Sequence, residues 1–171
     1  MNANRIRHHL ERTRASLEAA LGEVSAENWR QAPAPGRWSA AEVVVHLTMI
    51  ETRVQQGARK VLSHEPRAVP IWKRAHIPTR IVAWRSLRRV SPVHLDPTLL
   101  AEKAESLERH RACRQVTLEL LVEQARAGDR GHRWAHPFLG HLSLEKWLWM
   151  LGYHEVRHTK QIREIVASFQ R

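Results

Sequence analysis

The 171-residue sequence contains one cysteine and no long apolar run. A single thiol, Cys113, cannot form an internal disulfide, which fits a reducing cytoplasm. Its place in a helical pattern favours a packing role over that of a nucleophile. Because no run of about 18 apolar residues is present, no membrane-spanning helix is expected. Residues 1–14 lack the apolar core of an export signal, so we expect a cytoplasmic protein.

Acidic residues are absent from residues 66–95, which are rich in lysine and arginine. This segment contributes +7 of the formal net charge of +11, so the rest of the chain contributes only +4. Such a segment can bind an acidic partner, a nucleic acid or an anionic substrate, or it can be a solvated connection. We favour the solvated connection because no zinc-finger spacing and no aromatic RNA-binding motif accompany the charge.

Convincing strand alternation is also absent, whereas a helical period recurs in four segments. They span about residues 3–22, 40–63, 97–126 and 144–169. Ser39 and Glu42 form a capping-box pattern before the second segment, and Ser143 caps the fourth. Asp96 and Pro97 suit the cap and first position of the third. The sequence therefore predicts one all-α domain over residues 1–171, a four-helix bundle of antiparallel type.

The second and third helices are separated by a long irregular connection, which four prolines interrupt between residues 64 and 95. A connection of this length inside a compact domain often covers a pocket. We expect a short helix within residues 79–90. The stretch HPFLGHL (136–142) is expected to be a loop that leads into the last helix, with His136 packing in it or capping a turn.

Two histidines lie where the apolar face of the last helix should continue. His154 and His158 are four residues apart, and His46 lies on the inward face of the second helix. A buried imidazole without a polar partner costs about 1–3 kcal/mol, and one divalent ion would satisfy a nitrogen on each ring. Three protein nitrogens leave an open position on zinc, as in catalytic sites. The alternative is three separate core histidines, each with its own hydrogen-bond partner.

Two stretches resemble the signature regions of the DinB/YfiT-like superfamily of metal-dependent helical bundles. They are PGRWSAAEVVVHLTMIE (35–51) and HPFLGHLSLEKWLWMLGYHEVRHTKQI (136–162). The resemblance implies a four-helix bundle with a long link between helices two and three. It also implies a metal triad, whose histidines fall on His46, His154 and His158. Zinc or nickel is expected first. Iron and manganese stay as alternatives, because three imidazole ligands do not distinguish among these metals.

The resemblance implies a metal-dependent enzyme acting on a small molecule. We expect thiol S-transferase or hydrolase-like activity, with a low-molecular-weight thiol as a candidate substrate. One alternative is a non-catalytic protein that binds or senses a small ligand. A weaker alternative is nucleic-acid binding through residues 67–89. The abundance of tryptophan and leucine also suits a homodimer.

Three further residues are candidates for a role near the triad or its substrate, and a fourth is set aside. Glu51 lies one residue past a full helical turn from His46 and either orients that ring or forms a surface salt bridge. His110 and Arg114 interrupt the apolar face of the third helix. They either reach solvent or line a polar cavity, where they would contact an anionic substrate. Glu155 points about 100° away from its neighbour on the last helix, so we leave it out.

Overall fold

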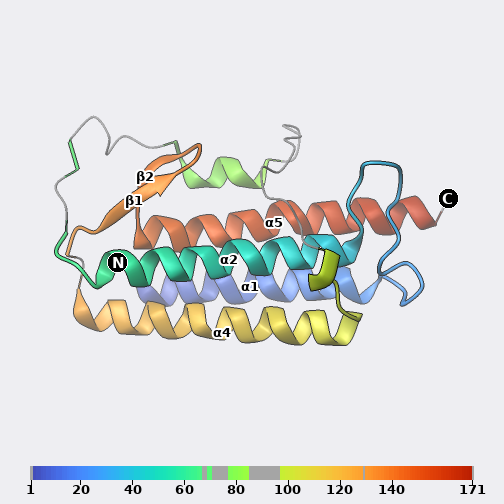
Figure 1. Cartoon of the computed structure of the whole chain (residues 1–171), viewed down its shortest axis with the longest axis horizontal. Coiled ribbons are helices and arrows are strands. Elements are labelled where there is room, and N and C mark those ends of the chain that lie inside the picture. The colour runs from blue at the N-terminus through green and yellow to red at the C-terminus, as the bar shows by residue number, and fades with distance from the viewer. Residues whose placement is uncertain (1, 67–68, 71–76, 85–96, 129, 171) are drawn as a thin grey trace.

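The computed structural model describes residues 2–66, 69–70, 77–84, 97–128 and 130–170. Its long helices lie side by side in a four-helix bundle (Figure 1). They are α1 (Ala3–Gly22), α2 (Ala40–Leu62), α4 (Lys103–Ala127) and α5 (Leu144–Phe169). Helices α1 and α2 are antiparallel, as are α4 and α5, but α2 and α4 run in the same direction. The connection between α2 and α4 is long because it must return along the whole bundle.

Side-chain caps define the start of three helices. Asn2 accepts the Arg5 backbone N–H at 3.1 Å at the start of α1. The predicted capping box of α2 is confirmed, since the Ser39 hydroxyl accepts the Glu42 N–H at 3.3 Å. The Ser39 N–H in turn donates to the Glu42 carboxylate at 2.7 Å. The predicted cap of α5 is also confirmed, because Ser143 accepts a backbone N–H one turn on.

The predicted start of the third helix is wrong. Pro97–Leu99 form a short 3-10 turn, η2, and α4 begins at Lys103 with Glu102 as its N-cap residue, while Asp96 lies outside the described residues. The carbonyl of Ala101 accepts the indole N–H of Trp29 at 2.9 Å and the Ser106 hydroxyl at 3.3 Å. These bonds hold that carbonyl outside the helix, so α4 starts after it.

The expected loop before α5 is a short β-ribbon, which the sequence pattern did not indicate. Strands β1 (Arg133–His136) and β2 (Gly140–Ser143) pair in antiparallel register. In the turn, Nδ1 of His136 accepts the backbone N–H groups of Phe138 at 3.1 Å and Leu139 at 3.2 Å, which confirms the capping role. Gly140 closes the turn at φ 86°, a conformation that favours glycine.

Part of the long connection packs on α5 as the 3-10 helix η1 (Thr79–Ala83) (Figure 1). The Arg157 guanidinium donates to the Trp84 carbonyl, and the Lys160 ammonium donates to the Ala83 carbonyl at 3.4 Å. The short helix expected over 79–90 is therefore present at its beginning, and residues 85–90 lie outside the described part. Of the basic residues of 66–95 only Arg80 is described, so the solvated connection stays a prediction.

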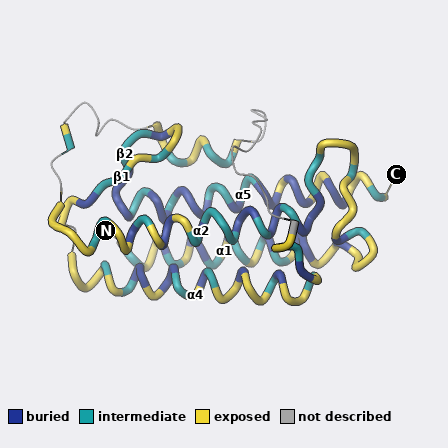
Figure 2. The backbone as a smooth tube through the Cα atoms, viewed as in Figure 1, coloured by how far each residue is buried: buried dark blue, intermediate teal, exposed yellow. Residues whose placement is uncertain are grey.

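The buried faces of the four helices point inward (Figure 2). One apolar cluster includes Ile6, Leu10, Val54, Leu121 and Leu148. A second includes Leu17, Leu21, Val43, Leu47 and Ile162. Along each helix, buried polar residues occupy the positions between the two clusters, namely Thr13, Glu51, His110, Arg114, Thr117 and Glu155. We call these six residues the polar layer.

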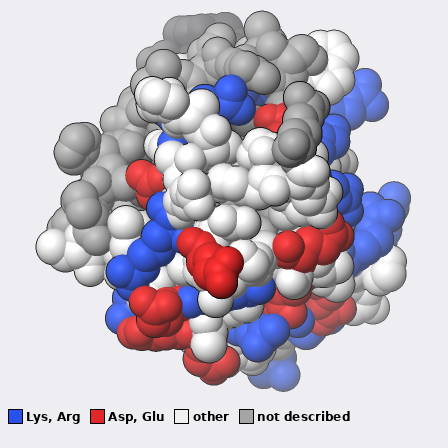
Figure 3. Space-filling model, turned by 90° about the vertical axis from the view of Figure 1, so that its right-hand side faces the viewer, with Lys and Arg blue, Asp and Glu red and all other residues white. Residues whose placement is uncertain are grey.

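Two further properties bear on partners. No helix within the described residues is both long and apolar enough to cross a membrane. At the end of the bundle where α5 finishes, Lys and Arg lie among Asp and Glu around an uncharged area (Figure 3). The part of that end which the structure describes therefore presents charges of both signs rather than one basic face.

Candidate metal centre

The three predicted histidines meet between α2 and α5. The Nε2 atoms of His46 and His154 are 3.3 Å apart, and those of His154 and His158 are 3.2 Å apart. One ligand nitrogen from each of the three rings falls within a 4.8 Å span. Within the described part of the chain, this is the one group of three or more side chains of metal-ligating type brought so close together.

These distances fit a tetrahedral metal. Zinc–nitrogen bonds of about 2.0–2.1 Å place tetrahedral ligand nitrogens about 3.3–3.4 Å apart. The two measured separations, 3.3 and 3.2 Å, agree with that edge length. At such a distance either one ring donates an N–H to the other, or two lone pairs face each other and repel. In the second case a cation between the rings relieves the repulsion. Three nitrogens also leave one coordination position for another ligand.

The outer nitrogens of two of the rings have different surroundings. Nδ1 of His158 lies 2.9 Å from the amide oxygen of Gln161, so it carries the proton and leaves the Nε2 lone pair facing the other histidines. Nδ1 of His46 is buried without a hydrogen-bond partner among the described residues. The His46 ring packs instead on Trp38, with 4.9 Å between ring centroids. Gln161 and Trp38 therefore hold the two rings from outside.

The surroundings keep two of the candidate ligands, His46 and His154, unprotonated. Burial lowers the pKa of His46 to about 4, with a further contribution from Arg53. Burial also holds the pKa of His154 well below its usual range, and the neighbouring rings of His158 and His46 add to the effect. At neutral pH the lone pairs of these imidazoles are therefore available to a cation.

A family model described as the DinB superfamily matches residues 9–162. The chain belongs to the DinB superfamily. The predicted family and the predicted four-helix bundle are thus confirmed. Proteins of this superfamily are generally metal-binding, and the three-histidine cluster is compatible with that property.

Two known proteins are similar to this DinB chain. The Uncharacterized protein YuaE of Bacillus subtilis (strain 168) is 26% identical over 151 residues, which cover 88% of this chain and 91% of that protein. The crystal structure of TT2238, a four-helix bundle protein, matches with a TM-score of 0.61 at 20% identity. That match covers 95% of this chain and 99% of the other, and it shows the shared fold.

Two predicted contacts with substrate are wrong for this superfamily member. His110 and Arg114 are each only 1% exposed, so neither reaches a substrate or solvent. Arg114 binds Glu51 and Glu155 instead, and His110 binds Glu155 at 3.1 Å between Nε2 and Oε1. Both residues belong to the polar layer.

The expected roles of Glu51 also need correction. The Glu51 carboxylate is 2% exposed and accepts the Arg114 guanidinium at 2.7 and 3.0 Å and the Thr117 hydroxyl at 2.6 Å. It is therefore neither an orienting partner of His46 nor a surface salt bridge. The side chain that does orient a candidate ligand is Gln161, one turn past His158, and the signature stretch already contained it.

A buried histidine on α1, His9, was also not predicted from the sequence pattern. His9 is 5% exposed and packs on the rings of Trp149 and Tyr153, with centroid distances of 4.6 and 4.8 Å. Its Nε2 has no hydrogen-bond partner among the described residues and lies against Gly152. The absence of a side chain at Gly152 makes room for this ring. The His9 ring therefore packs directly between α1 and α5.

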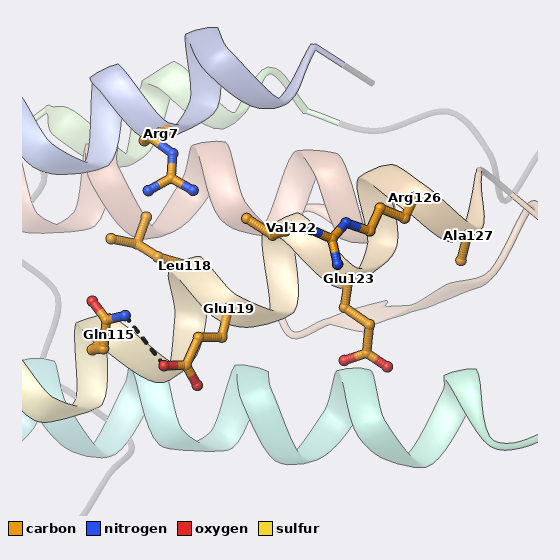
Figure 4. A pocket seen from close by; sticks show the side chains of 8 residues that line it. All are labelled: Arg7, Gln115, Leu118, Glu119, Val122, Glu123, Arg126 and Ala127. Carbon is orange, nitrogen blue, oxygen red and sulfur yellow. Dashed lines mark hydrogen bonds between the residues drawn. The ribbon is translucent and has the colours of Figure 1, made fainter.

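A groove on the bundle surface lies away from the histidines. It has a volume of about 590 Å³ and is open to solvent between α1 and α4 (Figure 4). Arg7 of α1 lines it together with Leu118, Glu119, Glu123 and Arg126 of α4. None of the triad residues lines this groove, so the candidate centre rests on ligand geometry and not on the shape of a cavity.

Proposed function

We propose that this DinB-superfamily chain is a metal-dependent enzyme in which His46, His154 and His158 hold one divalent ion. Zinc or nickel is the first choice, since imidazole nitrogen suits both. The reaction proposed is thiol S-transfer or a hydrolase-like reaction on a small molecule. A divalent ion at an open position supplies Lewis acidity and lowers the pKa of a thiol or water that binds to it.

A single observation supports this proposal above all others. The Nε2 atom of His154 lies about as far from those of His46 and His158 as two nitrogens of a tetrahedral zinc site lie from each other. One ligand nitrogen from each of the three rings falls within a 4.8 Å span. Separate core histidines would each require a hydrogen-bond partner of their own, yet His154 Nε2 has the other two imidazoles as its neighbours. Buried rings placed in this way favour a shared cation.

The chain's own residues would prepare the site in three ways. Burial keeps the imidazoles of His46 and His154 neutral. Gln161 accepts the Nδ1 proton of His158 and so directs its Nε2 inward. Trp38 packs beside two of the rings and excludes water from that side, with centroids 4.9 Å from His46 and 6.4 Å from His158.

Metal content tests the site directly. The protein is stripped with a chelator, dialysed against Zn²⁺ or Ni²⁺ and analysed for bound metal per chain. We expect one ion in the parent protein and none in His46→Ala, His154→Ala or His158→Ala. His132→Ala is the matched control, since His132 is buried but bonds the His64 carbonyl at 2.9 Å. Equal metal in the parent and in the three variants would contradict the site.

Turnover distinguishes an enzyme from a binding or sensor protein. The loaded protein is incubated with a low-molecular-weight thiol and an electrophile, and with a panel of ester and amide substrates. We expect product formation that depends on the added ion and is lost in His154→Ala. Stoichiometric metal with no product from any of these substrates would favour the sensor.

A further inference from the structure

Arg114 uses every donor of its guanidinium inside the bundle. Nε and Nη2 donate to the two carboxylate oxygens of Glu51 at 2.7 and 3.0 Å. Nη2 also donates to Glu155 Oε1 at 3.2 Å, while Nη1 donates to Glu155 Oε2 at 3.3 Å and to the Leu10 carbonyl at 2.8 Å. The guanidinium has five N–H groups, so none is left for a substrate.

The two carboxylates that Arg114 binds come from the helices that carry the candidate ligands. Glu51 belongs to α2 and lies five residues after His46. Glu155 belongs to α5 and lies between His154 and His158. Helix α4, which carries Arg114, contributes no histidine to the triad. One side chain of α4 therefore joins the two helices whose separation decides whether the three imidazoles meet.

Further hydrogen bonds fix each carboxylate in one orientation. Thr117 donates to Glu51 Oε1 at 2.6 Å, and the Gln55 amide donates to the Thr117 hydroxyl at 2.9 Å. Glu155 accepts the Thr13 hydroxyl and lies 3.1 Å from His110 Nε2. A rotation of α2 or α5 that moved its histidines would break several of these bonds at once. Because the bonds are buried, such a rotation would leave unpaired charges in the core.

We propose that Arg114 is a positioning residue for the histidine triad. By binding Glu51 and Glu155 together, it sets the rotation and spacing of α2 and α5 at which His46 meets His154 and His158. This inference rests on the proposed metal site. It differs from a purely stabilising role, since it requires that a change at Arg114 alters the affinity and the geometry of metal binding in protein that remains folded.

Co²⁺ is the probe, because its visible absorption reports coordination geometry while a titration gives the dissociation constant. Arg114→Lys keeps the charge but loses the fork that binds two carboxylates. We expect Arg114→Lys to bind Co²⁺ more weakly and to shift its absorption bands. The loss should approach the roughly 10–100-fold that removal of a direct outer partner of a metal ligand causes, although Arg114 acts through the helices and not on a ligand itself. Circular dichroism at the same concentration confirms that the protein measured is folded.

Two further variants make the result decisive. Leu121 lies on α4, like Arg114, but belongs to an apolar cluster. Leu121→Ala lowers stability by leaving a cavity and should bind Co²⁺ as the parent does. Glu51→Gln leaves Arg114 paired with Glu155 and loosens only α2. It should therefore fold even where Arg114→Lys does not, and should weaken Co²⁺ binding in the same direction.

Three results would contradict either the proposed metal site or the positioning role of Arg114, and they distinguish between the two. A parent protein that binds no Co²⁺ removes the proposed function and this inference with it. A parent that binds, together with folded Arg114→Lys and Glu51→Gln variants of unchanged affinity and spectrum, overturns the positioning role alone. So does a Leu121→Ala variant that loses as much affinity as Arg114→Lys, because the loss would then follow stability.

Discussion

The Nε2 atom of His46 lies 3.3 Å from the Nε2 atom of His154, although the two residues are 108 positions apart in the chain. The contact exists because α2 and α5 pack side by side in opposite directions (Figure 1). His158, one turn further along α5, brings its Nε2 to 3.2 Å from that of His154. The properties expected of the site depend on this proximity.

Replacement of Gln161 by leucine should weaken metal binding about 10–100-fold, the usual cost of losing an outer hydrogen bond to a ligating histidine. Without the amide oxygen, which lies 2.9 Å from His158 Nδ1, the ring is free to turn and to change tautomer. Competition with a chromophoric chelator measures the affinity for Zn²⁺. Gln161→Glu restores an acceptor and should recover most of the loss. Gln115→Leu, on the exposed face of α4, is the control that should change nothing.

Acid should destabilise the metal-free protein between about pH 6.5 and pH 4. Burial lowers the pKa of His46 from 6.5 to about 4, so in this range the unfolded chain binds a proton that the folded chain does not. The free energy of unfolding therefore falls as the pH falls, by about 3 kcal/mol for His46 over the full window. His154, whose pKa is also lowered, acts in the same direction.

Urea unfolding of chelator-treated protein at pH 7.5 and pH 5 measures this effect. A His46→Gln variant should lose less stability between the two pH values than the parent, because glutamine does not titrate. The lowered pKa of Glu155, which the Arg114 guanidinium holds down against the effect of burial, contributes only at more acidic pH. A parent protein with the same urea midpoint at both pH values would contradict the burial of neutral imidazoles.

Gly152→Ala should destabilise the protein by about 1–3 kcal/mol, the usual cost of overpacking a core. A Cβ atom at this position would lie 2.2 Å from Nε2 of His9, whose ring is buried. In a His9→Ala background the same change should cost little, since the ring is gone and alanine favours the helix. Thermal unfolding of the four proteins of this cycle gives the coupling energy. At Gly22 an added Cβ meets nothing within 4 Å, so Gly22→Ala is the neutral comparison.

Trp38 should report metal binding through its fluorescence. Its ring centroid lies 4.9 Å from that of His46, so an open-shell ion such as Co²⁺ at the triad would quench it efficiently. We expect emission to fall in proportion to occupancy during a Co²⁺ titration, and Trp38→Phe to remove a large part of that fall. Trp134→Phe should retain it, because Trp134 stacks on Trp147 at the β-ribbon. A Trp38→Phe variant quenched as strongly as the parent would argue against this location.

The helices were predictable wherever local chemistry determines them. Ser39 and Ser143 cap their helices with hydrogen bonds to residues three positions on, which a sequence displays directly. The start of α4 was not predictable, because it depends on the Ala101 carbonyl and the indole of Trp29, 72 positions earlier. The β-ribbon was missed because two four-residue strands are too short to show alternation.

Part of the candidate site was also predictable from the sequence, and part of it was not. Periodicity placed His46, His154 and His158 on inward faces, and the structure brings their nitrogens together. The partners of Glu51 and Arg114 could not be inferred, since a charged residue on an inward face has no visible counter-charge in its own helix. Only the packing of α2 against α4 shows that these two side chains neutralise each other.

The polar layer has a consequence for how the bundle can assemble. Helices with wholly apolar faces can slide past one another by a turn and still bury the same kind of surface. If α4 slid by one turn, about 5.4 Å, the Arg114 guanidinium would leave Glu51 and Glu155, and both carboxylates would lose their counter-charge. Breaking a buried ion pair costs about 3–5 kcal/mol, a large part of the roughly 5–15 kcal/mol by which a domain is stable. We therefore expect this chain to tolerate a single alignment of its helices and to have no competing slipped forms.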